Sequence, residues 1–461
     1  MVKQIKSVGV LDRISNLPDH ILCDVLSFLP GKDAARTSVL SHRWRYLFVS
    51  SLSTLDFTRF LAPRENDENF LEFVDRFFSN PNRVSLECFR VNDFWVDCHI
   101  PLGKSEIRWG INPPWRDDYV RLDGWICAAL RRGVKEFGIH SINQNFLTLP
   151  TLLFTCQSLV TLKLSITGAH HVPSNACLPN LRTLHFAYFV FRDGPSVLKL
   201  ISSCPLLEDL AFVRCRFHER NELNISSLSL KRLVLDFEKI VARDRGFDLV
   251  AVNAPNLVYF KYVDNDDMAE GCTLSDMKSL EKADVKITLL GSEGRGHARN
   301  LLRRICNIQS LYLAIEDLVV INQVNVFETQ LESVFAFHNL VEFEFVNYSD
   351  WQAAWIVEFL HCMPNLMKLV LDLRTAEEGF GSLPNALPAC LLFHLKEIET
   401  GYIKEDEGLF ELISYFLKHA LVLEKLVIRI YASCDEDRLH AIEKLSSLPK
   451  GSKKCDVMFL D

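Results

Sequence analysis

The stretch LPDHILCDVLSFLPGKDAARTSVLSHRWRYL, residues 17–47, contains three short amphipathic helical patterns in succession. The first follows Pro18-Asp19, a pair that suits the start of a helix, and its apolar residues fall at helical spacing: Ile21, Leu22, Val25 and Leu26. Pro30-Gly31 ends this helix, and Ser41 precedes the last pattern, which contains Trp44. So short a segment cannot bury this many apolar groups within itself. We therefore predict that its spare apolar surface packs against a partner, either elsewhere in the chain or on another protein.

The same residues resemble an F-box motif, with unbroken spacing from Leu17-Pro18-Asp19 through Leu26-Ser27-Phe28-Leu29-Pro30 to Arg43-Trp44. Val39-Leu40-Ser41 stands where many members of the family have Val-Cys before the basic-Trp pair, a small departure. The resemblance implies docking onto the Skp-type adaptor of an SCF (cullin-RING) ubiquitin ligase. It also implies which residues form or support the adaptor-binding surface: Leu17, Pro18, Ile21, Leu22, Leu26, Val39 and Trp44. The alternative is that these residues only pack against the following domain.

The bulk composition suits a soluble, folded protein with a small module and an elongated domain. The chain has 461 residues, of which 48% are hydrophobic and 24% charged. A net charge of −8 gives no reason to expect nucleic-acid binding, and no apolar run is long enough to predict a membrane span. The 14 cysteines contain no Cys-x-x-Cys pair, and no signal peptide precedes Leu17, so we predict free thiols in a reducing compartment. Some cysteines precede apolar repeats and are predicted to be buried: Cys156, Cys204 and Cys306.

A pattern of the form Leu-x-x-Leu-x-Leu recurs from residue 134 to residue 428, with consecutive anchors between 22 residues apart (159 to 181) and 32 apart (308 to 340). This spacing is typical of a leucine-rich repeat of irregular length. Pro-x-Leu at the start of several units, as in Pro179-Asn180-Leu181 and Pro255-Asn256-Leu257, supports the assignment. The predicted fold class is α/β: a small all-α F-box, then a solenoid with a curved parallel sheet on its concave face and helices or irregular turns outside.

In such a sheet the repeat leucines point inward, so the residues between them form an exposed column. That column is predicted to run through Lys163, His185, Ala211, Val234, Lys261, Asp284, Tyr312, Glu344, Val370, Glu399 and Val427. It begins with basic and neutral residues and turns acidic after Lys261. A solvated face and a groove that selects a partner of matched charge both remain open. As candidate substrate-binding residues we take Lys163, His185, Lys261, Asp284, Tyr312 and Glu344.

Two Trp residues in an irregular, proline-containing stretch are further candidates for substrate binding. Trp109 and Trp115 are flanked by Arg108 and Arg116, and Trp and Arg are frequent anchors of protein interfaces. The alternative is that they fill the junction between the F-box and the first repeats.

The C-terminal part of the chain, from Leu395-Lys396-Glu397 through Leu423-Glu424-Lys425-Leu426 to Cys455-Asp456-Val457, resembles an FBD domain. This module follows the repeats in many plant F-box proteins, and its strands are expected to continue or cap the solenoid. The predicted domains are residues 13–50 (F-box), 51–383 (irregular repeats) and 384–461 (FBD-like). Together the three resemblances indicate a plant F-box/FBD/leucine-rich-repeat protein.

No catalytic or metal-binding pattern is found in the sequence, so we predict neither an enzyme nor a cofactor. The glycines of GSEGRGHAR, residues 291–299, lack the third glycine of a dinucleotide-binding turn and are predicted to form a flexible loop.

The resemblance implies the substrate-recognition subunit of an SCF ubiquitin ligase, which binds a Skp-type adaptor, through it the cullin and RING subunits, and an unknown protein substrate. A hormone receptor of the F-box/repeat type and an adaptor-independent repeat scaffold are the alternatives. Cytoplasm and nucleus are both open as locations, because the sequence has no clear basic import signal.

Overall fold

The computed structural model describes residues 14, 16–29, 36–37, 39–44, 47, 53–56, 74–75, 77–79, 86–92, 116–141, 149–217, 222–237, 249–263, 272–289, 291–317, 336–347, 353–373, 386–403, 407–431 and 435–460. The chain divides into two units. The first unit comprises Met1–Gly168 with Asn175–Leu181, and the second comprises Ala169–Ser174 with Arg182–Asp461.

In the first unit a helical segment precedes a parallel sheet. The segment includes α1 (Asp19–Ser27), and the sheet has the order β1 (Thr54–Asp56), β2 (Cys88–Asn92), β3 (Glu136–Ser141) and β4 (Thr161–His170). The helix α5 (Arg116–Arg131) and the short 3-10 helix η1 (Thr151–Phe154) lie between successive strands of the chain.

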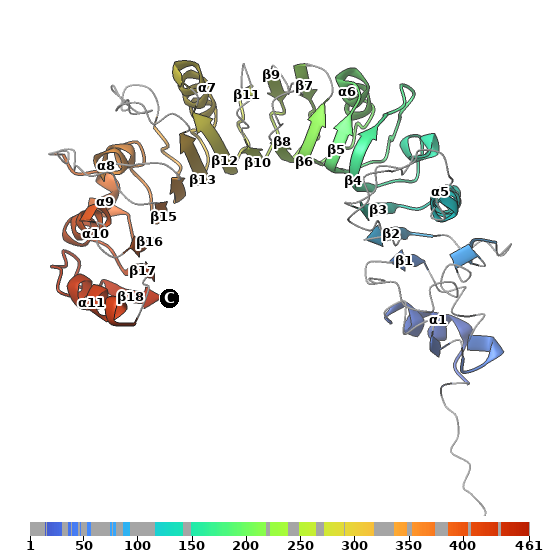
Figure 1. The fold of residues 1–461 in the computed structure, drawn as a ribbon, viewed down its shortest axis with the longest axis horizontal. Coiled ribbons are helices and arrows are strands. Elements are labelled where there is room, and N and C mark those ends of the chain that lie inside the picture. Colours follow the sequence, from blue (N-terminus) through green and yellow to red (C-terminus); the bar gives the residue numbers. More distant parts are fainter. Residues whose placement is uncertain are drawn as a thin grey trace, which may run out of the picture. The chain divides into compact units, whose positions relative to one another are not determined.

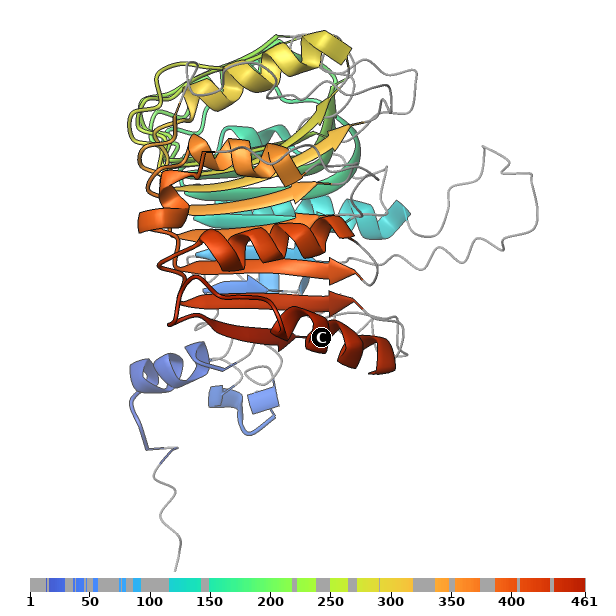
Figure 2. The same cartoon turned by 90° about the vertical axis from the view of Figure 1, so that its left-hand side faces the viewer.

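The second unit is a parallel sheet in which almost every strand follows its predecessor at the interval of one repeat. Its order is β5 (Thr183–Phe191), β6 (Asp209–Phe217), β8 (Arg232–Phe237), β10 (Tyr259–Val263), β12 (Lys282–Leu289), β13 (Ser310–Asp317), β14 (Glu342–Asn347), β15 (Lys368–Leu373), β16 (Glu397–Ile403), β17 (Lys425–Tyr431) and β18 (Asp456–Leu460). Figure 2 shows the C-terminal strands, in orange and red, running side by side in one direction.

Helices cover one face of this sheet and leave the other without a covering element among the described residues (Figure 1). They are α6 (Gly194–Ser202), α7 (Gly291–Arg304), α8 (Ala353–His361), α9 (Ala389–Phe393), α10 (Glu407–His419) and α11 (Asp435–Ser446). Between α6 and α7 a three-stranded parallel sheet takes the place of helices, in the order β11 (Cys272–Leu274), β9 (Leu249–Asn253) and β7 (Glu222–Ser226) (Figure 1). The predicted solenoid is confirmed, and the second small sheet is a feature that sequence reasoning missed.

The residues of the repeat pattern form the core. Every anchor named by the pattern, from Val134 to Ile428, is buried, and the most exposed of them, Phe345, is only 8% exposed. In this core the large rings of Phe186, Phe191 and Phe212 lie within 6 Å of one another, with centroid separations of 5.1, 5.8 and 5.9 Å. Stacking repeats therefore buries one continuous apolar layer in each unit, as a solenoid requires.

The predicted loop at residues 291–299 is wrong, because these residues form the first part of α7. Glycine disfavours a helix by about 1 kcal/mol per residue, but tertiary packing overrides such propensities. Here Ala298, Leu301 and Leu302 are buried, and α7 contacts β11 and β12. The apolar side of the later turns therefore holds the helix in place.

The predicted free thiols are confirmed for the cysteines in the described part of the chain. Cys156 and Cys204 are buried, whereas Cys306 is only half-buried and does not belong fully to the core. Burial raises the pKa of the Cys390 thiol to about 12, so this side chain stays protonated and acts as a small apolar group.

Candidate functional site

The N-terminal helical segment has its own small core. Leu22, Leu26, Trp44 and Leu47 are buried together, and Leu17 and Cys23 pack against them. Side-chain hydrogen bonds from Arg43 join the end of the segment to its beginning. The Arg43 side chain donates hydrogen bonds to Asp19 Oδ1, from Nε at 2.9 Å and from Nη2 at 2.6 Å, and Nη2 also donates to the Leu17 carbonyl at 2.6 Å. The Trp44 N–H donates to Ser41 Oγ at 3.2 Å, so Ser41 caps the helical turn that contains Trp44.

This core separates the residues predicted for adaptor binding into two groups. Leu22, Leu26 and Trp44 point inward and support the segment, and Leu17 is half-buried. Pro18, Ile21 and Val39 lie at the surface; Ile21 is 37% exposed and Val39 84% exposed.

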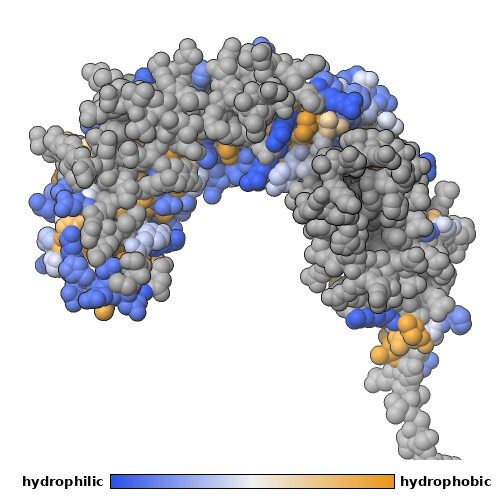
Figure 3. Space-filling view, in the orientation of Figure 1, coloured by the Kyte–Doolittle hydropathy of each residue, from blue (hydrophilic) through white to orange (hydrophobic). Residues whose placement is uncertain are grey.

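Sequence reasoning missed several further apolar residues of the segment that are exposed. Val25 is 45% exposed, Phe28 87% and Leu40 67%. Ile21, Val25 and Phe28 are separated by four and three residues, so they follow one side of the helix, whereas Leu22 and Leu26 follow the other. That spacing groups the three residues on one side of the helix, and the core around Trp44 decides that this side faces outward. Figure 3 shows the resulting apolar surface in orange, at the place that α1 occupies in Figure 1.

The predicted column of residues between the repeat leucines is present as a row in the sheet of the second unit. The strand register aligns His185 with Ala211, then Val234, Lys261, Asp284, Tyr312, Glu344, Val370, Glu399 and Val427. Lys163, in the first unit, is exposed and aligns there with Gly138 of β3. We call the row from His185 to Val427 the middle row.

The prediction that the whole column is exposed is wrong at three positions. Ala211, Val234 and Val427 are 3%, 4% and 4% exposed. Neighbouring strands are only about 4.8 Å apart, so longer side chains on both sides cover short ones. The candidates Glu344 and Lys163 are exposed, and His185, Lys261, Asp284 and Tyr312 are half-buried. The remaining candidates, Trp109 and Trp115, lie outside the described residues.

The His185 side chain contacts Asp209 of the neighbouring strand β6. Its Nε2 lies 3.0 Å from Asp209 Oδ2, and Arg232 Nη1 lies 3.0 Å from the other oxygen of the same carboxylate. Burial acts to raise the pKa of Asp209, but His185 and Arg232 outweigh it and lower that pKa. His185 therefore belongs to a local cluster of polar side chains with Asp209 and Arg232.

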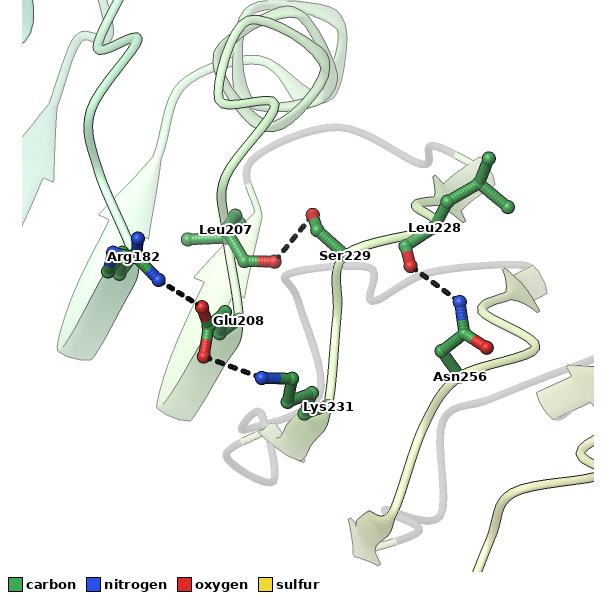
Figure 4. A network of polar contacts seen from close by, with 7 residues as sticks. All are labelled: Arg182, Leu207, Glu208, Leu228, Ser229, Lys231 and Asn256. Carbon is green, nitrogen blue, oxygen red and sulfur yellow. Dashed lines mark hydrogen bonds and ion pairs between the residues drawn. The ribbon is translucent and has the colours of Figure 1, made fainter.

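Polar contacts between successive repeats hold the strands of this face in register (Figure 4). The Glu208 carboxylate pairs with Lys231 at 3.0 Å and with Arg182, and the hydrogen bond from Lys231 is the main cause of its lowered pKa. Ser229 Oγ donates to the Leu207 carbonyl at 2.8 Å, and Asn256 Nδ2 donates to the Leu228 carbonyl at 2.8 Å. Ser229 and Asn256 each precede the first leucine of a repeat, so these side chains join one repeat to the one before it.

Replacing Ser229 by Ala is expected to lower the free energy of unfolding by about 1 kcal/mol, because the Leu207 carbonyl loses its hydrogen-bond donor. Urea denaturation followed by circular dichroism measures the change. Ser202→Ala is the matched control, since the exposed Ser202 hydroxyl bonds only within its own helix, to the Lys199 carbonyl. Equal losses in the two variants would contradict a role for Ser229 between repeats.

The carboxylates in and beside the acidic part of the middle row repel one another. Partial burial raises the pKa of Glu344, and the nearby carboxylates Asp284, Glu399 and Asp372 raise it further, while Lys282 acts in the opposite direction. Asp284 accepts a hydrogen bond from the Tyr259 hydroxyl. A negative charge on Glu344 is therefore less favourable in the folded chain than in the unfolded one.

Glu344→Gln is expected to stabilise the chain at pH 7, by less than about 1 kcal/mol because solvent screens an exposed side chain. A raised carboxyl pKa means that folding is penalised above that pKa, whereas below the ordinary value of about 4.3 the group is protonated in both states. The gain should therefore be present at pH 7 and absent near pH 4, as thermal unfolding at the two pH values would show. Glu358→Gln, in the helix α8, is the control for the loss of one exposed negative charge. An equal gain in stability in this variant would contradict a contribution from the carboxylates around Glu344.

Within the described residues, no group of three or more His, Cys, Asp or Glu side chains is arranged to hold a metal ion. None of the described helices combines the length and apolar character that crossing a membrane requires.

Comparison with known families matches three parts of the chain. The F-box domain model matches residues 14–55, the model of the LRR repeats of the FBD-associated F-box protein At5g56370 matches residues 122–279, and the FBD model matches residues 384–428. The FBD match includes α9, β16, α10 and most of β17, whose strands continue the repeat sheet.

Relatives match over nearly the whole length. The chain is 30% identical to the F-box/LRR-repeat protein At4g14096 of Arabidopsis thaliana over 467 residues, which cover 95% of this chain and 92% of the relative. It is 28% identical to the F-box/FBD/LRR-repeat protein At2g26030 of the same plant over 480 residues, covering 97% of this chain and 99% of that protein. The chain thus belongs to the plant F-box/FBD/leucine-rich-repeat protein family.

Proposed function

We propose that the chain is the substrate-recognition subunit of an SCF ubiquitin ligase, whose F-box binds a Skp-type adaptor and whose repeat sheet recruits a protein target. The observation that carries the proposal is the apolar surface of Ile21, Val25, Phe28, Val39 and Leu40, displayed by a segment that already has its own core. Large exposed apolar groups of this kind mark interaction sites. An F-box domain also implies an adaptor of the Skp type.

In this proposal the chain itself makes and breaks no covalent bonds. The adaptor connects it to the cullin and RING subunits, and the repeats hold the target beside the ubiquitin-loaded enzyme. Proximity turns the transfer of ubiquitin to a target lysine into an effectively intramolecular step. The sheet face of the second unit suits the recruitment of a target protein, since solenoids use such curved surfaces for binding.

The test is co-purification of the full chain with a Skp-type adaptor, beside the double variant Leu17→Ala/Pro18→Ala. Both residues lie at the start of the segment, where Leu17 is half-buried against its core and Pro18 is exposed. The wild type should bind, and the variant should lose binding while its repeats stay folded by circular dichroism. A folded wild-type chain that fails to bind would overturn the proposal and leave an adaptor-independent repeat scaffold.

A further inference from the structure

The sheet of the second unit has a further row of aligned residues, here called the third row, two positions after the middle row on each strand; Ala314 and Val346 in it are buried. The register aligns Asp236, Val263, Lys286, Ala314, Val346 and Asp372 in this order. In these two rows the cations Lys261 and Lys286 lie on β10 and β12, and the carboxylates Asp284, Glu344, Asp372 and Glu399 lie on β12 to β16. Arg214, at the register shift of β6, lies outside both rows. The two groups are therefore neighbours on one continuous face.

The basic group consists of Arg214, Lys261 and Lys286 around one carboxylate, Asp236. Burial raises the pKa of Asp236, and the three cations, which are near enough to act on it, work in the opposite direction. Three positive charges thus act on one half-buried carboxylate, and a second carboxylate, Asp284, is the register neighbour of Lys261. The group brings three cations together on this face, which an anionic segment of a partner would complement.

The backbone places Arg214 in this group by an unusual conformation. Arg214 (φ 52°) and Tyr188 (φ 57°) both adopt left-handed conformations, and the pairing of β6 with β8 shifts register between Val213 and Cys215. Such a conformation costs on the order of 1–3 kcal/mol in a residue other than glycine, and bulges of this type redirect a side chain. The Arg214 guanidinium lies 5.8 Å from the centre of the Tyr188 ring, so the two side chains support each other.

The acidic group consists of Asp284, Glu344, Asp372 and Glu399. Each of the other three carboxylates acts to raise the pKa of Glu344, so all three lie near enough to repel its negative charge. Glu399 is paired with Arg429, and Asp284 with the Tyr259 hydroxyl. Repulsion among these carboxylates lowers the stability of the free chain and would be relieved by a partner's cations.

We propose that this face binds an extended peptide segment of the recruited protein with an acidic block over Arg214, Lys261 and Lys286 and a basic block over Glu344 and Asp372. The proposal rests on the proposed function and names the chemistry of the target segment.

The geometry also sets the spacing of the two blocks. Lys261 on β10 and Glu344 on β14 are three strands apart in the order β10-β12-β13-β14. At about 4.8 Å between strands the two charges are roughly 14 Å apart, and an extended peptide advances about 3.3 Å per residue, so the centres of the two blocks are about four residues apart.

The test measures binding of synthetic peptides to the full chain by fluorescence anisotropy at low salt. One peptide is Glu-Glu-Glu-Gly-Lys-Lys-Lys, a second has the reverse block order, and a third has the same composition with alternating charges. One of the block peptides should bind about tenfold more tightly than the alternating peptide, and the difference should shrink as salt is added. Equal binding of all three peptides, or no binding, would overturn the proposal.

Charge reversals then locate the site. Lys261→Glu/Lys286→Glu and Glu344→Lys/Asp372→Lys should each weaken binding of the preferred peptide about tenfold. The variant with all four substitutions exchanges the positions of the positive and negative charges on the surface. It should therefore bind the peptide of the other block order. Lys278→Glu, an exposed change outside both rows, is the matched control and should leave binding unchanged. Equal weakening by the control, or no recovery in the combined variant, would contradict the assignment.

The same variants are tested for co-purification with the Skp-type adaptor. Peptide binding without adaptor binding would contradict only the proposed ligase role. Adaptor binding without peptide binding would contradict only the proposed chemistry of the target segment.

Discussion

Replacing Val39 by Asp is expected to weaken binding of a Skp-type adaptor by at least about 100-fold while the chain stays folded. Val39 is 84% exposed, so the folded chain on its own tolerates a charge at this position. If the side chain is covered by the adaptor, the carboxylate has to be desolvated without a partner, which costs several kcal/mol, and about 2.7 kcal/mol already corresponds to 100-fold. Isothermal titration calorimetry with the purified adaptor measures the change.

Two further variants separate loss of the surface from loss of the fold. Leu439→Asp makes the same kind of change at an apolar residue that is 62% exposed in α11 of the second unit, and it should leave adaptor affinity unchanged. Leu22→Ala removes a fully buried side chain and should cost about 2–5 kcal/mol of stability in the N-terminal segment, with adaptor binding lost because the segment unfolds. If Val39→Asp binds like the wild type, the adaptor does not cover this surface.

Phe186→Ala is expected to reduce the free energy of unfolding of its region by about 3–5 kcal/mol, the largest stability effect that we predict. The ring is fully buried, and its centroid lies 5.0 Å from that of Phe189, 5.1 Å from Phe191 and 5.9 Å from Phe212. Removing it leaves a cavity among rings that cannot collapse around it without breaking their own contacts. Urea denaturation gives the size of the effect.

The effect should be local, because each repeat of a solenoid contacts only its neighbours. Hydrogen exchange should rise first in β5 and β6 and least in β16 and β17. Phe393→Ala is the matched control: Phe393 is 66% exposed, and the same substitution there should change stability by no more than about 0.5 kcal/mol. Similar losses in both variants would contradict the packing described for Phe186.

Much of the fold could be predicted because burial in a repeat follows a local pattern. The spacing of Leu207, Leu210 and Phe212, repeated from unit to unit, was enough to identify buried anchors, since a strand alternates its side chains between two faces. The outer layer was harder. The helix over residues 291–304 depends on its contacts with β11 and β12, and the small sheet of β7, β9 and β11 pairs short segments that lie outside the repeat pattern.

The candidate sites show the same division. The sequence by itself determined the F-box-like segment, the repeats and the middle row, because each depends on residue type at short, regular spacing. Only the tertiary structure decided that Leu22 and Trp44 point inward while Val25 and Phe28 face outward, since this depends on how the helices of the segment pack together. Only the tertiary structure brought Arg214 and Lys261 near the same carboxylate, Asp236, and Asp372 near Glu344. These pairs are far apart in the chain, and the register of neighbouring strands, together with one bulge, places them on the same face.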